Sequence, residues 1–142
     1  GPLGLRALMA ERTLYVDTSA WYEAVVEGAP RHAEVAPWIA SGEVALVTTT
    51  YVLSELATLL ARRFGHGPAV TVGARLRSSS DVRIVHPSPE TERRAWDLFC
   101  ARPDKGYSFC DCVSFVVMKE LGMTAALATD RHFAQEGFLV VP

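Results

Sequence analysis

The chain has 142 residues, of which 49% are hydrophobic and 21% are charged, and its formal net charge is −2. This length fits one well-packed domain and is too short for two ordinary ones. The composition is that of a soluble globular protein, and no apolar run reaches the roughly 18 residues of a membrane span. The lack of net positive charge argues against a passive DNA- or RNA-binding module. It argues less against a nuclease, whose metal ions supply part of the positive charge that a phosphate needs.

The first four residues, Gly-Pro-Leu-Gly, resemble a scar left by protease cleavage of an expression tag. We therefore expect residues 1–12 to be a scar and lead-in, and one domain to occupy residues 13–142. The three cysteines, Cys100, Cys110 and Cys112, lie in apolar helical patterns without a CxxC pair. This usage indicates reduced thiols in the core of a cytoplasmic protein and disfavours a zinc site.

Strand-like and helical patterns alternate along the chain. Residues 13–16 predict a strand that ends at Asp17, followed by a helix with Thr18 or Ser19 as its N-cap. The other strands are predicted at residues 44–48, 81–86, 125–129 and 138–141. The other helices are predicted at residues 31–40, 52–64, 67–78 and 89–101, then from Ser108 to Gly122, with a single turn at 130–135. Short, uniformly apolar strands between helices indicate an α/β fold with a parallel sheet covered on both faces.

The helix that begins at Ser108 is apolar over most of its circumference, which is typical of a core helix. Ser108 and Asp111 stand in the S-x-x-D relation of a helix start, so Ser108 can cap while Asp111 lies in the first turn. Asp17 and Asp130 each follow an apolar strand. Ligands of parallel α/β folds gather at the carboxyl ends of the strands, so we expect both acids at this edge.

Four acids are therefore candidates for one site: Asp17, Glu55, Asp111 and Asp130. Each alone has an ordinary structural explanation, as a strand-end turn, a solvated helix border, a helix-start acid or a turn cap. Together they would repel, since two like charges about 4 Å apart cost roughly 4 kcal/mol at an effective dielectric of 20. Such a cluster must take up protons or bind a cation. Oxygen ligands without His or Cys select Mg²⁺ or Mn²⁺, which can activate a water against a phosphodiester.

Four short motifs also occur in a recognisable order on the predicted elements. They are Asp17-Thr18-Ser19, Ser54-Glu55-Leu56, Tyr107-Ser108-Phe109-Cys110-Asp111-Cys112 and Thr129-Asp130-Arg131-His132-Phe133. Together they resemble the PIN domain, in particular the VapC-like toxins of bacterial toxin–antitoxin pairs, over about Thr13 to Pro142. The resemblance implies a three-layer α/β/α fold with a central, mostly parallel sheet of four to five strands.

The resemblance further implies a metal-dependent endoribonuclease that hydrolyses RNA phosphodiester bonds and acts as a toxin. On the family pattern Asp17, Glu55 and Asp111 would be the main acids of a Mg²⁺ or Mn²⁺ site, and Asp130 the fourth. Two hydroxyl side chains would support these acids or a metal water, those of Ser19 and Thr129. The resemblance also implies a homodimer inhibited by a VapB-like antitoxin. The chain departs from the pattern at Cys110, where relatives commonly carry Thr, and at Gly106, where an acid is frequent.

The basic candidates for RNA contact are Arg62, Arg63, Lys105, Arg131 and His132, with a solvated helix face as the default for the first two. The aromatic residues in helical patterns are expected to be core or dimer contacts rather than base-stacking platforms: Trp21, Tyr22, Trp38 and Trp96.

Two other functions are compatible with parts of the sequence. A phosphotransfer protein could use Asp17 as its nucleophile, but such families usually need a second acid where Ser19 stands. A PIN-like module could bind RNA or protein without catalysis, and its sign would be a missing acid. No motif indicates which RNA would be cut.

Overall fold

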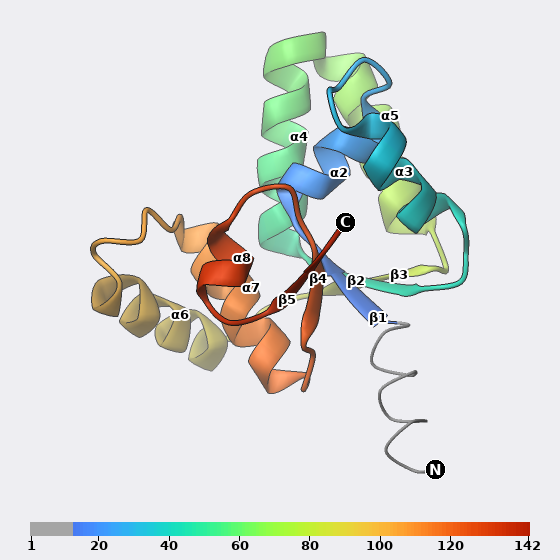
Figure 1. Cartoon of the computed structure of the whole chain (residues 1–142). Helices are drawn as coiled ribbons and strands as arrows, with labels where there is room; N and C mark the ends of the chain where they lie inside the picture. Colours follow the sequence, from blue (N-terminus) through green and yellow to red (C-terminus); the bar gives the residue numbers. More distant parts are fainter. Residues whose placement is uncertain (1–12) are drawn as a thin grey trace, which may run out of the picture.

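A computed structural model describes residues 13–142, so the expected scar and lead-in at residues 1–12 lie outside the described part. Five parallel strands form one sheet in the order β3-β2-β1-β4-β5 (Figure 1). The strands are β1 (Thr13–Val16), β2 (Ala45–Thr49), β3 (Val82–Val85), β4 (Ala125–Leu127) and β5 (Leu139–Val141). The predicted α/β fold with a parallel central sheet is confirmed.

Seven helices are found among the described residues, and they form two groups in Figure 1, with α2 to α5 apart from α6 to α8. The first group is α2 (Thr18–Val25), α3 (His32–Ala40), α4 (Thr50–Phe64) and α5 (His66–Ser78). The second is α6 (Pro89–Ala101), α7 (Phe109–Glu120) and α8 (His132–Gln135). None of these helices is long and apolar enough to cross a lipid bilayer.

The strand order reverses direction between β1 and β4, which pair side by side at the centre of the sheet. The backbone N–H of Asp17 donates to the carbonyl of Leu127 at 3.1 Å, so the carboxyl ends of these two strands lie together. Such a point of reversal is where parallel α/β folds place their ligands. The topology therefore brings the residues after β1 and after β4 to one place.

Helix α7 is the buried helix that the sequence predicts, with every residue from Asp111 to Met118 buried. Its first turn is closed by a capping box: Ser108 Oγ accepts from the N–H of Asp111, and Asp111 Oδ2 accepts from the N–H of Ser108, both at 3.0 Å. Gly122 follows the helix with φ 68°, a left-handed conformation that glycine adopts without steric cost. The cap and the stop together fix where this helix begins and ends.

Several expected boundaries differ because local hydrogen bonds decide them. Helix α2 is capped by Asp17 rather than Thr18 or Ser19, since the carboxylate Oδ2 of Asp17 accepts from the backbone N–H of Ser19. Helix α4 begins at Thr50, two residues before the predicted start, because the Thr49 hydroxyl accepts from the N–H of Val52. Strand β4 ends at Leu127 rather than at residue 129.

One expectation about the core is wrong, because Cys100 is exposed. Trp96 is 56% exposed, so of the two places expected for it, the core or a dimer contact, the structure excludes the core. Trp21 is buried as expected, and its indole N–H donates to the hydroxyl of Thr48. Of the remaining thiols, Cys112 is buried and Cys110 is half-buried at the first turn of α7.

Candidate metal centre

Asp17 lies at the carboxyl end of β1 and is only 3% exposed. Its Oδ2 accepts hydrogen bonds from the Ser19 hydroxyl at 2.7 Å and from the Ser19 backbone N–H at 3.3 Å. Ser19 Oγ in turn accepts from the backbone N–H of Thr129 at 3.1 Å, which ties the loop after β4 to the start of α2. The predicted supporting role of Ser19 has this geometry, whereas Thr129 contributes its backbone N–H.

Electrostatic crowding is strongest at Asp17. Burial, followed by the negative charge of Asp130 and then that of Asp111, raises the pKa of Asp17 to about 7, although hydrogen bonds from Ser19 oppose the rise. A carboxylate that is disfavoured by its neighbours in this way is relieved either by a proton or by a cation. The three aspartates therefore act on one another, as the topology predicts.

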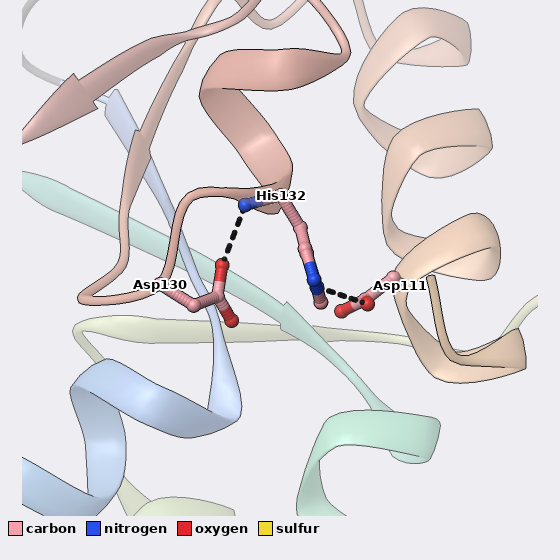
Figure 2. A group of neighbouring side chains, drawn as sticks. All are labelled: Asp111, Asp130 and His132. Carbon is pink, nitrogen blue, oxygen red and sulfur yellow. Dashed lines mark hydrogen bonds and ion pairs between the residues drawn. The ribbon is translucent and has the colours of Figure 1, made fainter. Parts of the chain in front are cut away.

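Asp111 and Asp130 form a cluster with His132, in which one ligand atom from each residue lies within 4.8 Å of the others. Figure 2 shows Asp111 at the start of α7 facing the imidazole of His132, while Asp130 reaches the backbone nitrogen of His132. Nδ1 of His132 is 2.8 Å from Asp111 Oδ2, and the N–H of His132 donates to Asp130 Oδ1 at 3.0 Å. A contact between α7 and the segment after β4 thus closes this side of the site.

The three aspartates share one arrangement that suits a metal ion. The side-chain hydrogen bonds found among residues 13–142 reach Oδ2 of Asp17, Oδ2 of Asp111 and Oδ1 of Asp130. In each case the second carboxylate oxygen accepts none of these bonds. Oxygen atoms with free lone pairs, gathered in a crowded anionic site, are the donor set that Mg²⁺ and Mn²⁺ prefer. The residues present therefore fit a hard divalent cation.

Glu55 approaches from α4 and is exposed, outside the cluster of Asp111, Asp130 and His132. It lines a groove of about 660 Å³ along α4, and Arg62, about two helical turns further on, also lines this groove. The groove further contains Thr50, Tyr51, Ser54, Thr58 and Leu59. This groove offers an open surface next to the buried aspartates.

Cys110 lies close enough to Glu55, Asp17 and Asp111 for their charges to act on its thiol. Burial, then the negative charge of Glu55, then that of Asp17, raises the pKa of the Cys110 thiol well above its ordinary value. The thiol is therefore held protonated and acts as a small, nearly apolar side chain at this position. A threonine here would add a hydroxyl close to Glu55 and Asp111, which the cysteine lacks.

Three helices begin at this edge of the sheet, namely α2, α4 and α7. Their N-caps are Asp17, Thr49 and Ser108. The start of a helix carries partial positive charge and free N–H groups, which favour anions nearby. This backbone field offsets part of the carboxylate repulsion and favours an approaching phosphate.

The predicted RNA-contact residues do not form one cluster. Arg62 lines the α4 groove, while Lys105 and Arg131 are exposed. Arg63 donates to the Tyr22 hydroxyl at 3.0 Å and lies over the Tyr22 ring at 5.3 Å. Arg63 is thereby engaged within the protein. The remaining candidate, His132, bonds two of the acids, which is a role that the sequence did not predict for it.

The chain matches a known protein family over most of its length. The family model described as PIN domain matches residues 14–139. The chain is 38% identical over 128 residues to the 23S rRNA-specific endonuclease VapC20 of Mycobacterium tuberculosis, which covers 90% of this chain and 97% of that protein. It is 32% identical over 90 residues to a VapC ribonuclease of Archaeoglobus fulgidus, covering 63% of this chain and 56% of that protein.

Solved structures give the same result. The crystal structure of M. tuberculosis VapC20, described as a sarcin–ricin loop cleaving toxin, matches with a TM-score of 0.85 and 37% identity, over 91% of this chain and 99% of that one. FitAcB from Neisseria gonorrhoeae matches at 0.67 and 16% identity, over 91% of this chain and 96% of that one. PAE2754 from Pyrobaculum aerophilum matches with a TM-score of 0.57 and 18% identity, over 91% of this chain and 92% of that one. The last two share the fold.

Proposed function

The chain belongs to the PIN-domain family, as a relative of the VapC ribonucleases, and on this basis we propose that it is a metal-dependent endoribonuclease. The observation that carries the proposal is the crowded aspartate site at the carboxyl ends of β1 and β4. There Asp17, Asp111 and Asp130 each keep one oxygen that accepts no hydrogen bond from residues 13–142. A non-catalytic member of the family would be expected to lack one of the acids, and this chain lacks none.

Asp17, Asp111 and Asp130 would hold the cation, with Glu55 completing the set from the α4 side. A bound Mg²⁺ or Mn²⁺ supplies a water of lowered pKa and neutralises charge on the phosphate. The chain's own residues bind and orient: Ser19 fixes Asp17, the capping box fixes Asp111, and the helix starts favour the phosphate. The α4 groove, with Arg62 at its wall, would receive the adjoining RNA backbone.

The test is cleavage of labelled RNA by the purified chain with Mg²⁺ or Mn²⁺, next to the variants Asp17→Asn and Asp111→Asn. We expect both variants to lose cleavage while remaining folded, and EDTA to stop the wild-type reaction until Mn²⁺ is restored. Full activity in both variants would refute the assignment of the site. Cleavage that survives EDTA would refute the metal dependence.

We propose that the substrate is ribosomal RNA, because the relative that matches 90% of the chain is a 23S rRNA-specific endonuclease. The first substrate to test is a labelled hairpin with the sequence of the sarcin–ricin loop, since the matching solved structure is of a toxin that cleaves that loop. A scrambled hairpin of equal length is the control. Equal cleavage of both hairpins would contradict this choice of substrate.

A toxin role follows from the same relatives, and we propose that a cognate VapB-like antitoxin inhibits the chain in the cytoplasm. Free thiols at all three cysteines fit a reducing compartment. The test is growth of a bacterial host that expresses the chain, with and without the small reading frame next to its gene. Growth unaffected by the wild-type chain would argue against the toxin role.

We also propose a homodimer formed through an aromatic cluster, which consists of Trp96, Phe99, Phe109 and Tyr51. Trp96 is 56% exposed and contacts Phe99 and Phe109, with ring centroids 5.8 and 6.2 Å away. Phe109 in turn packs edge-on against Tyr51, which lines the α4 groove. Exposed aromatic side chains are enriched at protein interfaces. A second copy docked here would set the two α4 grooves close together, so each dimer would present one continuous surface to RNA.

A further inference from the structure

Within residues 13–142, His132 is the single residue that bonds two of the proposed metal-site acids. Its backbone N–H donates to Asp130 Oδ1, and its imidazole Nδ1 lies 2.8 Å from Asp111 Oδ2 (Figure 2). Asp111 is on α7 and Asp130 follows β4, so the two acids come from different elements. If the imidazole were displaced or removed, Asp111 would lose its hydrogen bond to Nδ1, while the backbone N–H would still donate to Asp130.

The position of the imidazole is fixed on a second side. The His132 ring meets the ring of Tyr107 edge-on, with centroids 5.4 Å apart, and Tyr107 is itself packed edge-on against Phe115. Tyr107 and Phe115 are both buried. The ring is therefore wedged between a buried aromatic side chain and the Asp111 carboxylate, which restricts its rotamer. A residue packed in this way is suited to orient a neighbour.

The bond also determines which Asp111 oxygen would be available to a cation. A carboxylate only accepts hydrogen bonds, so Nδ1 of His132 carries the hydrogen in this contact. Together with the N–H of Ser108 it occupies Oδ2 of Asp111, and no side-chain bond within residues 13–142 reaches Oδ1. Ligating carboxylates that are held by such outer bonds lose metal affinity, typically 10- to 100-fold, when the bond is removed.

We propose that His132 is a positioning residue for the metal site, which holds the Asp111 carboxylate through Nδ1–H so that Oδ1 faces the cation. This role rests on the proposed metal-dependent function. It differs from a direct contact to RNA and from direct ligation of the metal, in both of which the imidazole would act without Asp111. The Asp111 bond predicts which replacement can rescue the site, because only a donor at the Nδ1 position will serve.

The test is to measure the affinity of four variants for Mn²⁺ at pH 8 and to compare it with that of wild type. Binding is monitored through the electron paramagnetic resonance signal of free Mn²⁺. His132→Ala removes the donor, and about 10- to 100-fold weaker binding is expected. His132→Asn carries its amide nitrogen at the Nδ1 position and should bind within about three-fold of wild type by the same reasoning. His132→Gln carries its amide at the Nε2 position and should resemble His132→Ala. His66→Ala, which removes an exposed imidazole from the start of α5, is the matched control and should bind as wild type.

Two spectroscopic readouts do not depend on activity, and the first of them needs no metal. Nitrogen-15 NMR of the metal-free chain should show His132 with its hydrogen on Nδ1, and Asp111→Asn should perturb that signal. Pulsed resonance of the Mn²⁺ complex should show no coupling to a directly bound imidazole nitrogen. A strong imidazole coupling would overturn the proposal in favour of direct ligation.

The remaining outcomes separate this inference from the function on which it rests. Wild-type chain without affinity for Mn²⁺ would refute the metal dependence and this role together. Mn²⁺ binding that is equal in wild type and His132→Ala would overturn the positioning role alone and leave the metal site standing. If His132→Ala loses affinity for RNA but keeps the wild-type affinity for Mn²⁺, the positioning role is also overturned, because His132 would then contact the substrate.

Discussion

Replacing Asp17 by Asn should stabilise the metal-free protein at high pH while abolishing its metal site. The folded-state pKa of Asp17 is raised from 3.8 to about 7, first by burial and then by the charges of Asp130 and Asp111. The folded protein therefore binds this proton more tightly than the unfolded chain does. The resulting stability is complete below about pH 4, declines as the pH rises, and is lost above about pH 7.

The size of the effect follows from the shift. A difference of about 3 pKa units corresponds to about 4 kcal/mol of unfolding free energy, which is an upper figure because neighbouring charges relax when one is removed. Asn keeps a side-chain oxygen that can accept from Ser19, so the cap of α2 is retained. The variant should thus equal wild type near pH 4, exceed it increasingly up to about pH 7, and keep a constant advantage from there to pH 8.

Urea unfolding in EDTA, at half-unit steps from pH 4 to pH 8, measures this difference. Asp104→Asn, which removes an exposed acid in the loop before α7, is the control and should follow wild type throughout. Adding Mg²⁺ at pH 8 should raise the unfolding free energy of wild type and leave that of Asp17→Asn unchanged. A cation stabilises only a folded protein that binds it, and the variant lacks the Asp17 carboxylate that would hold the cation. An Asp17→Asn protein that is less stable than wild type at pH 8 in EDTA would refute the idea that charge crowding dominates this site.

Three further changes test other parts of the structure. Ser108→Ala should cost about 1 kcal/mol in urea unfolding, because the backbone N–H of Asp111 loses the Ser108 hydroxyl as its acceptor; an unchanged unfolding free energy would refute the role of the cap. Trp96→Glu should convert a dimer to a monomer in light scattering without lowering the unfolding free energy, since the side chain is 56% exposed; an unchanged mass would refute the aromatic interface. Iodoacetamide at pH 8 should alkylate exposed Cys100 well before Cys110, whose thiol pKa is raised by burial and by Glu55; peptide mass spectrometry showing the reverse order would contradict the description of that thiol.

The fold could be predicted from sequence because the elements that build it carry unambiguous periodicities. The apolar circumference of α7 and the short apolar runs of β1 and β4 have one physical solution each, a core helix and buried parallel strands. Asp17 and Asp130 could be placed at one edge for the same reason, since parallel strands bring their carboxyl ends together. Glu55 was the weakest of the four candidates without the family resemblance, because an acid at the border of an amphipathic helix has no distinguishing pattern of its own.

Other features depend on contacts that no local pattern encodes. The bond between His132 and Asp111 joins residues 21 positions apart and depends on the rotamer that Tyr107 imposes on the imidazole. The only local signal was the spacing of His132 two residues after Asp130, which suits a side chain that accepts from the N–H two positions on. The sequence left Trp96 between a core position and a dimer contact, and only packing shows that Ala95 lies on the buried side of α6 while Trp96 is exposed.

The hydrogen bonds that cap helices α2 and α7 also orient the carboxylates of the proposed metal site. The capping box that starts α7 occupies one oxygen of Asp111, and the cap of α2 occupies one oxygen of Asp17. Folding therefore fixes the carboxylates before any cation arrives, so the cation need not order them when it binds. The same folding brings their charges together in a buried place, which raises the pKa of Asp17. A preorganised but repulsive site converts metal binding directly into stability, so the gain in unfolding free energy on adding Mg²⁺ should follow metal affinity across variants of these acids.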